Sequence, residues 1–258
     1  MLNTVLHGSP TDRPPLLIVH GLFGSARNWG AIARRLSEDR LVITLDQRNH
    51  GDSPWLDRHG YEEMAADIAE VIRAHVDAPA GQQIDVVGHS MGGKAVMQLA
   101  LTEGQLIRRL IVADIAPVAY RHTQMPLVHA MRDMDLSNLS SRGEADRRLA
   151  ASVEDPGTRA FLLQSLDLKA DPPRWKLNLE VLGAEMPRIL SWPGTEGTFE
   201  GPTLFLTGAL STYVSSEDRP AIKALFPNAK FAKLPGAGHW LHADRPREFE
   251  AAVATFLA

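Results

Sequence analysis

Cysteine is absent from this chain of 258 residues. Disulfide bonds, thiolate nucleophiles, iron–sulfur clusters and cysteine-based zinc sites are therefore excluded. The chain also has no apolar run that approaches the roughly 18 residues of a membrane-spanning helix. Its first twelve residues do not combine a basic stretch with an apolar run, as a secretory signal would. We therefore expect no membrane span and a cytoplasmic location.

No block of basic residues is present either. The Lys and Arg residues are scattered, at most as doublets such as Arg34-Arg35 and Arg147-Arg148, and 27 of them face 31 acidic residues. The resulting net charge of −4 argues against nucleic acid or an anionic membrane as a partner. With 44% hydrophobic and 22% charged residues, the composition is that of a folded globular protein.

Strand patterns alternate with helix patterns along the first half of the chain. Short apolar runs predict buried strands, and apolar residues at helical spacing predict helices between them. The strands are expected at 15–20, 41–45, 84–87 and 110–113, and the helices at 28–36, 61–76 and 93–101. The alternation resumes with strands at 203–207 and 230–234 and helices at 221–225 and 246–257. This order predicts an α/β fold with a mostly parallel sheet flanked by helices.

The alternation stops between residues 118 and 200, a stretch that holds four of the eight Met and two of the five Trp residues. We therefore expect an α/β core formed by 1–117 and 201–258, with a helical lid at 118–200 inserted between two strands. The insertion leaves the carboxyl end of a strand, where open α/β sheets bind ligands. A cover over a ligand pocket is one interpretation, and additional packing without a site is the other.

The motif that indicates chemistry is the run 88–93 (GHSMGG), between a predicted strand and a predicted helix. It matches the G-x-S-x-G nucleophile elbow, in which the serine sits in a tight, strained turn. Glycine is needed two residues before and after Ser90, because side chains there would collide with the strand or the helix. The alternative is a glycine-rich turn with a bystander serine.

Acyl transfer needs two N–H donors aimed at the developing oxyanion. The N–H of Met91 is one candidate, and the run 20–24 (HGLFG), directly after a strand, supplies the other, which we assign to Leu22. His20 in this run could be taken for the catalytic base. The interpretation that we favour is that His20 holds the loop by hydrogen bonds.

A histidine base is expected late in the chain, in the glycine-rich run 236–240 (GAGHW) between the last strand and the last helix. His239 lies in the turn itself and could approach the elbow. His242 is the alternative, but it lies closer to the final helix.

These motifs together resemble the α/β-hydrolase superfamily nearly from end to end. The segments 46–54 (DQRNHGDSP), 88–94 (GHSMGGK) and 174–182 (RWKLNLEVL) are similar to YbfF-type esterases and their eukaryotic relatives. The resemblance implies a serine hydrolase that cleaves carboxylic esters or thioesters through an acyl-enzyme. Ser90 would be the nucleophile and His239 the general base. No metal or organic cofactor is needed.

One departure concerns the acid of the triad. The superfamily usually places it after the strand that follows the lid, where this chain reads TGALSTY at 207–213 without a carboxylate. We assign the acid to Asp114, at the end of the preceding strand. The alternatives are that Asp114 only caps the end of its strand, or that Glu217 or Asp218 is the acid.

The residues Asp46, His50 and Asp52 look like an oxygen and nitrogen metal cluster, but on this fold their loop packs beneath the active site.

The insertion predicts an apolar substrate pocket. We expect its binding residues to be Phe23, Met125, Phe161, Trp175 and Trp192, with further lining from Met131, Met134, Leu162 and Leu177. Such a pocket favours small to medium acyl chains of about four to eight carbons. Arg174 and Lys176 would either meet a phosphate-bearing leaving group such as coenzyme A or be ordinary solvated charges.

Other functions remain open at this point. The same triad could hydrolyse a carbon–carbon bond or act as a perhydrolase, or the fold could be a ligand receptor with incidental turnover. Haloalkane dehalogenation is disfavoured because it uses an Asp nucleophile, and this chain has Ser90. The expected partner is a small-molecule ester or thioester. The sequence does not identify the acyl group, the leaving group or the oligomeric state.

Overall fold

A seven-stranded sheet forms the centre of the computed structural model, which describes residues 1–76 and 81–258. In spatial order its strands are β1 (Thr4–His7), β3 (Val42–Leu45), β2 (Leu16–Val19), β4 (Ile84–His89), β5 (Ile107–Ala113), β8 (Thr203–Gly208) and β9 (Ala229–Leu234). Every neighbouring pair is parallel except β1 with β3, which is antiparallel. The predicted mostly parallel sheet is confirmed.

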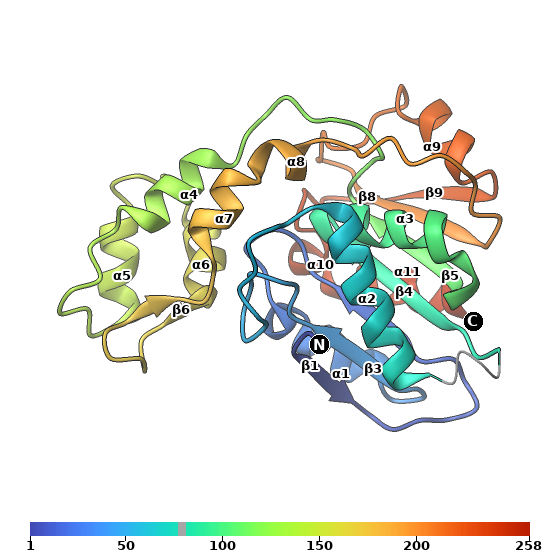
Figure 1. Ribbon diagram of the computed structural model, residues 1–258, viewed down its shortest axis with the longest axis horizontal. Coiled ribbons are helices and arrows are strands. Elements are labelled where there is room, and N and C mark those ends of the chain that lie inside the picture. Colours follow the sequence, from blue (N-terminus) through green and yellow to red (C-terminus); the bar gives the residue numbers. More distant parts are fainter. Residues whose placement is uncertain (77–80) are drawn as a thin grey trace.

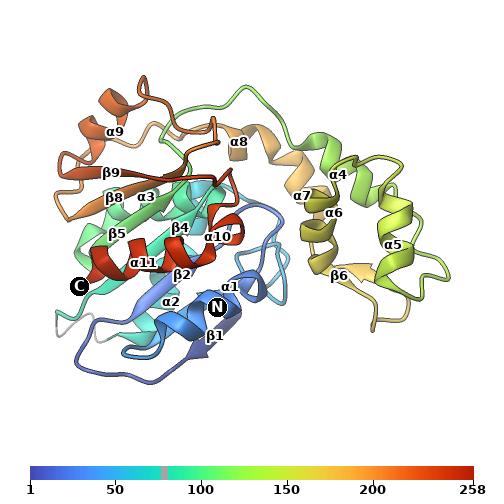
Figure 2. The ribbon, with the colours of Figure 1, turned by 180° about the vertical axis from the view of Figure 1, so that it is seen from behind.

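Helices cover both faces of the sheet (Figures 1 and 2). On one face lie α2 (Tyr61–His75), α3 (Met91–Glu103) and α9 (Arg219–Leu225), and on the other lie α1 (Ala26–Leu36) and α11 (Pro246–Leu257), which the short α10 (Leu241–Asp244) precedes. Each layer has its own apolar core. The predicted helix at 28–36 begins two residues earlier, because Ser25 and Asn28 form a capping box in which Asn28 is the third helical residue.

The insertion between β5 and β8 is largely helical and lies to one side of the sheet (Figure 1). Its elements are α4 (Met125–Arg132), α5 (Arg142–Leu149), α6 (Pro156–Leu162), β6 (Leu166–Asp167), β7 (Arg174–Trp175), α7 (Leu179–Ala184) and α8 (Met186–Leu190). The small β6–β7 hairpin and the edge strand β1 were not predicted. Both are short, and β1 is only partly buried, so neither gives the continuous apolar run of a central strand.

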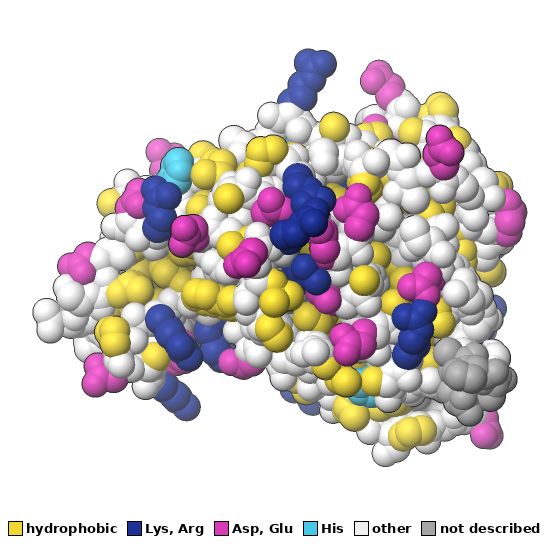
Figure 3. Space-filling model, in the orientation of Figure 1, with side chains coloured by type: hydrophobic (Ala, Val, Ile, Leu, Met, Phe, Trp, Pro, Cys, Tyr) yellow, Lys and Arg dark blue, Asp and Glu magenta, His cyan; other side chains and the backbone are white. Residues whose placement is uncertain are grey.

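Charged side chains of both signs are interspersed over the face seen in Figure 3, and apolar side chains gather over the inserted helices and along their border with the core. Within residues 1–76 and 81–258, no helix combines the length and the apolar character needed to cross a bilayer.

A buried lysine of the core forms hydrogen bonds with the end of the insertion. Lys94 lies on α3, is 1% exposed, and its Nζ donates to the carbonyl oxygens of Leu190 (3.2 Å) and Ser191 (2.6 Å) at the end of α8. Its ammonium group lies 4.7 Å from the centre of the Tyr120 ring. Among the described residues no carboxylate pairs with it, and burial lowers the pKa of Lys94 to about 7.

This environment predicts a pH-dependent contribution to stability. Between pH 7 and pH 10.5 the folded protein holds Lys94 mostly neutral, whereas the unfolded chain keeps it protonated. Because the unfolded state then binds more protons, the free energy of unfolding gains a term that rises with pH in this window. Urea denaturation across the window should show a shallower rise for Lys94→Met than for the wild type. The control Lys230→Met, at an exposed position on β9, should show the same dependence of the free energy of unfolding on pH as the wild type. A Lys94→Met variant with the wild-type pH dependence would contradict this account.

Candidate active site

Ser90 occupies a strained turn between β4 and α3. Its backbone angles are φ 52° and ψ −122°, a conformation that non-glycine residues rarely adopt and that clusters at functional sites. The flanking glycines leave room for the turn, as the motif predicts. A Cβ atom on Gly88 would lie 2.4 Å from a methyl carbon of Val96, and one on Gly92 would lie 2.4 Å from the carbonyl oxygen of His20. The turn therefore presents the serine hydroxyl beyond the end of the strand.

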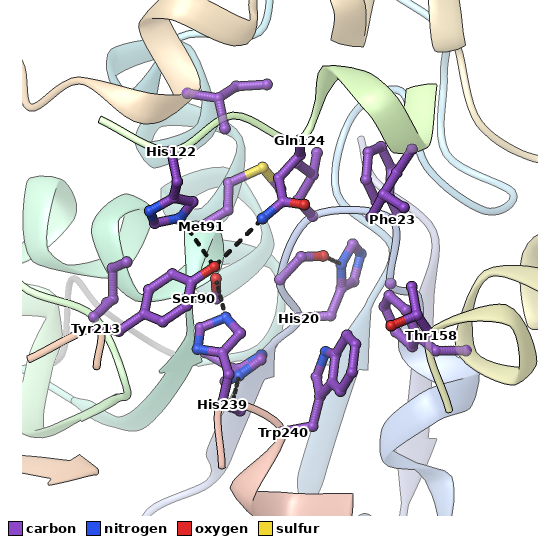
Figure 4. Close-up of a pocket in the computed structure, with 18 of the residues that line it drawn as sticks. His20, Phe23, Ser90, Met91, His122, Gln124, Thr158, Tyr213, His239 and Trp240 are labelled. Carbon is purple, nitrogen blue, oxygen red and sulfur yellow. Dashed lines mark hydrogen bonds between the residues drawn. The ribbon is translucent and has the colours of Figure 1, made fainter. Parts of the chain in front are cut away.

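His239 and Asp114 complete a hydrogen-bonded chain with this serine (Figure 4). His239 Nδ1 lies 2.7 Å from Asp114 Oδ2, and His239 Nε2 lies 2.9 Å from Ser90 Oγ. An ionised carboxylate can only accept hydrogen bonds, so Nδ1 carries the imidazole proton and donates it to Asp114. Nε2 is then the acceptor, and the Ser90 hydroxyl donates to it. The arrangement can remove a proton from the serine.

The Asp114 carboxylate is fully buried and is held from several sides. Its Oδ1 accepts from the N–H of Gly208 (3.1 Å), and its Oδ2 also accepts from the hydroxyl of Ser211. The alternatives for the acid point elsewhere: Asp218 accepts from the N–H of Ser215 at 2.7 Å, and Glu217 is exposed. The structure thus places Asp114, and neither later carboxylate, against the imidazole.

The alternative histidine, His242, is buried, and among the described residues no hydrogen bond joins it to Ser90. Its ring stacks on Trp29 with ring centres 4.0 Å apart, and burial, with His239 nearby, lowers its pKa to about 3. Another histidine, His89 at the end of β4, donates from Nε2 to the carbonyl oxygen of His239 at 2.8 Å. His89 therefore fixes the backbone of the loop that carries the imidazole.

Leu22 and Met91, the expected oxyanion donors, both border the cavity above Ser90. Met91 begins α3, so its N–H belongs to the first turn and has no carbonyl partner within that helix. The N–H of Leu22 has no acceptor among the described residues. The next amide, that of Phe23, donates to His50 Nε2 at 3.1 Å and is not available. Within residues 1–76 and 81–258, both N–H groups are thus without a hydrogen-bond acceptor, in residues that border the cavity containing Ser90.

His20 and His50 hold the loop that carries Leu22. His20 donates from Nδ1 to the carbonyl of Gly21 (2.7 Å) and accepts at Nε2 from the N–H of Gln47 (2.9 Å). His50 donates from Nδ1 to the carbonyl of Arg48 (2.9 Å). Each ring donates from Nδ1 and accepts at Nε2, which is the pattern of a neutral imidazole, and burial lowers the pKa of both histidines.

The carboxylates of Asp46 and Asp52, which suggested a metal site, form hydrogen bonds and an ion pair with neighbouring residues instead. The Asp46 carboxylate accepts from the backbone N–H groups of Ala26 (2.7 Å) and Asp52 (2.9 Å). Asp52 itself pairs with Lys176 at 2.6 Å. In the part of the chain that the structure describes, no group of three or more potential ligands could hold a metal ion.

A cavity of about 520 Å³ opens over Ser90, between the core loops and the insertion. Of the expected binding residues, Phe23 and Phe161 line it. Much of the remaining wall was not predicted and comes from Trp29, Tyr120, His122, Gln124, Leu127, Tyr213 and Trp240. Trp240 could have been found from its place next to His239 in the sequence.

Contrary to the expectation that they line the pocket, Met125, Trp175 and Trp192 do not border this cavity. Trp175 is 6% exposed and its indole N–H donates to the carbonyl of Met131 at 2.8 Å, so it is buried within the main apolar core. Met125 packs against Gly183 of α7, and Trp192 packs on the main apolar core. The other apolar residues expected there, Met131, Met134, Leu162 and Leu177, also pack outside the cavity. These side chains pack into or against one apolar core, which extends from the sheet into the insertion.

Comparisons with known proteins show which proteins this chain resembles. Residues 16–252 match the sequence profile described as "Alpha/beta hydrolase family". The chain is 38% identical to the zebrafish sn-1-specific diacylglycerol lipase ABHD11, over 95% of the chain and 79% of that protein. It is 36% identical to esterase YbfF of Escherichia coli K12, over 95% and 94%. A solved marine microorganism esterase superposes with a TM-score of 0.91 at 37% identity, over 99% and 98%.

The position of the acid can be tested with three variants measured side by side. Asp114→Asn should keep the fold and the KM, while kcat on an ester falls by about 10³–10⁴-fold because the imidazole loses its orienting carboxylate. Glu217→Gln and Asp218→Asn are the controls, and each should cost less than about tenfold. If Glu217→Gln or Asp218→Asn shows the large loss of kcat instead, the acid lies on the later loop. If all three are mild, a group other than a carboxylate orients His239.

Proposed function

The chain belongs to the α/β-hydrolase family, and from that premise we propose that it cleaves carboxylic esters or thioesters through an acyl-enzyme formed on Ser90. It is a carboxylesterase-type hydrolase, since relatives named as an esterase and as a lipase match 95% of it at 36% and 38% identity. The observation that carries the finer proposal is the continuous chain from Ser90 Oγ through His239 to Asp114, with heavy-atom distances of 2.9 and 2.7 Å.

The proposed reaction begins when Ser90 Oγ attacks the carbonyl carbon of the ester. His239 Nε2 takes the serine proton, and Asp114 stabilises the imidazolium ion that forms. The negative charge that develops on the carbonyl oxygen is stabilised by the N–H groups of Met91 and Leu22. Collapse of this intermediate breaks the ester bond, and His239 returns its proton to the departing alkoxide or thiolate.

Water completes the cycle. It attacks the acyl-enzyme carbonyl while His239 Nε2 removes one of its protons. The second tetrahedral intermediate then collapses, the carboxylic acid leaves, and the proton returns to Ser90 Oγ. The side chains described above are sufficient for these reaction steps, and the proposed mechanism uses no metal ion or organic cofactor.

The cavity supports an uncharged, apolar acyl group. Aromatic rings from the core and the insertion form much of its wall, with Phe161 and Trp240 in contact at a centre-to-centre distance of 5.3 Å. In the proposed arrangement the insertion is a lid that closes the pocket over the nucleophile. Arg174 and Lys176 do not border the cavity, and Lys176 pairs with Asp52. Their proposed contact with a coenzyme A phosphate therefore loses its support.

Replacement of the nucleophile tests the mechanism. Ser90→Ala should lose ester hydrolysis by about 10⁶-fold, because the acyl-enzyme route is removed, while the folded state persists. Steady-state hydrolysis of p-nitrophenyl esters measures the loss, and labelling by a fluorophosphonate should disappear with it. The exposed Ser216→Ala is the matched control and should keep full activity. A folded Ser90→Ala protein that still turns over would refute the mechanism, and a wild type that binds ligand without turnover would favour a receptor.

The size of the cavity predicts the chain-length profile. The kcat/KM value for p-nitrophenyl esters should rise with each added methylene, because each one stabilises the transition state by up to ~0.8 kcal/mol. It should peak at about four to eight acyl carbons. Phe161→Ala should move the peak toward longer chains, because it enlarges the cavity. Trp55→Ala, at a residue that is 55% exposed and outside the cavity, should leave the peak in place. A peak at acetate esters, or on long-chain triglycerides, would contradict the proposed pocket.

A further inference from the structure

The ring of Tyr213 lies flat against the imidazole of His239. The two ring centres are 3.6 Å apart and the planes differ by 14°, so one face of the imidazole is covered by an aromatic face (Figure 4). Tyr213 belongs to the loop after β8, the same loop in which Ser211 donates to Asp114. The sequence motifs gave no indication of this residue.

The ring is held in this orientation at its backbone and at its tip. The N–H of Tyr213 donates to Ser211 Oγ (3.2 Å), and its carbonyl oxygen accepts from the hydroxyl of Tyr120 (2.8 Å). Its own hydroxyl lies 3.0 Å from His122 Nε2 and accepts from Gln124 Nε2 at 3.4 Å. Burial raises the pKa of Tyr213, so the phenol stays neutral. The residue therefore presents a fixed, uncharged aromatic face to the imidazole.

An aromatic face carries partial negative charge and attracts a cation placed over it. A neutral imidazole gains little from this attraction, whereas an imidazolium ion gains more. His239 is an imidazolium ion only after it has taken the serine proton. The Asp114 carboxylate acts on the edge of the ring at Nδ1, so the aromatic face acts from a different direction and adds to it.

We propose that Tyr213 is a positioning residue that holds the His239 ring in line with Ser90 and stabilises the imidazolium ion in the transition state by a cation–π interaction. The proposal rests on the proposed function, in which His239 accepts the serine proton. Since the interaction strengthens as charge develops, it lowers the barrier of the chemical step and affects substrate binding little.

Other ionisable groups also face His239, and they must stay constant in a test. Asp114 approaches from the end of β5, His89 from β4 with its ring centre 4.9 Å away, and His242 from α10. His122, from the segment before α4, touches the Tyr213 hydroxyl. Substitutions confined to the Tyr213 ring leave the first three groups in place, so a change between variants reports on the ring.

The first experiment compares Tyr213→Leu, which removes the aromatic face, with Tyr213→Phe, which keeps the face and loses the hydroxyl. On a p-nitrophenyl ester, kcat of the leucine variant should fall by about 2- to 30-fold while KM stays within about twofold. The acidic limb of its pH–rate profile should also move to lower pH, because the protonated form of the imidazole is stabilised less. The phenylalanine variant keeps the face and loses only the contacts of the hydroxyl with His122 and Gln124, so it should retain clearly more of kcat than the leucine variant and move the acidic limb less. Equal loss in both variants would overturn the proposal, since the hydroxyl contacts would then carry the effect.

A second experiment keeps the shape of the ring. Phenylalanine analogues of increasing fluorination at position 213 weaken the negative face stepwise with little change in size, so they do not depend on the leucine variant folding. The logarithm of kcat should fall steadily along the series, and a flat series would overturn the proposal. Fluorophosphonate labelling of Ser90 in the unsubstituted protein separates this outcome from a failure of the proposed function, in which the wild type itself would neither label nor hydrolyse esters.

Discussion

The hydrogen bond between His239 and Asp114 is the interaction on which the rest of the site depends. A fully buried carboxylate is costly unless hydrogen-bond donors surround it. Asp114 obtains its donors from Gly208 and Ser211 on one loop and from His239 on another. Both loops are thus assembled around one carboxylate, and the imidazole that completes its shell presents its other nitrogen to Ser90.

The order of the sheet makes this assembly possible. The strands β4, β5, β8 and β9 are adjacent and parallel, so their carboxyl ends lie along one edge. Backbone bonds continue past the strand ends, from Ser90 N–H to the Ala113 carbonyl (3.0 Å) and from Asp114 N–H to the Leu206 carbonyl (2.9 Å). The insertion leaves between β5 and β8, which sets it over this edge, and Lys94 on the elbow helix fastens its return. The connection that interrupts the alternation of strands and helices along the chain therefore builds part of the wall of the cavity.

The elbow and its glycines could be predicted from the sequence because their constraint is local: Gly88 and Gly92 are needed by the backbone turn around Ser90 itself. The position of Asp114 follows from one further step, the adjacency of two parallel strands. The cavity wall could not be predicted in the same way. Composition shows that the insertion holds Met and Trp residues, but it does not show which way a side chain points, and Trp175 faces inward to a carbonyl of its own layer. The stacking of Tyr213 on His239 joins two loops and depends on hydrogen-bond partners more than eighty residues away, so no local pattern predicts it.

The central claim, a covalent acyl group on Ser90, can be tested most directly by mass spectrometry. The protein is mixed with an activated ester, quenched in acid before the acyl group is released, and digested for peptide mapping. The account predicts a mass increase equal to one acyl group, located on Ser90 in the peptide that joins β4 to α3. An unmodified peptide during turnover, or an acyl group on another side chain, would contradict it.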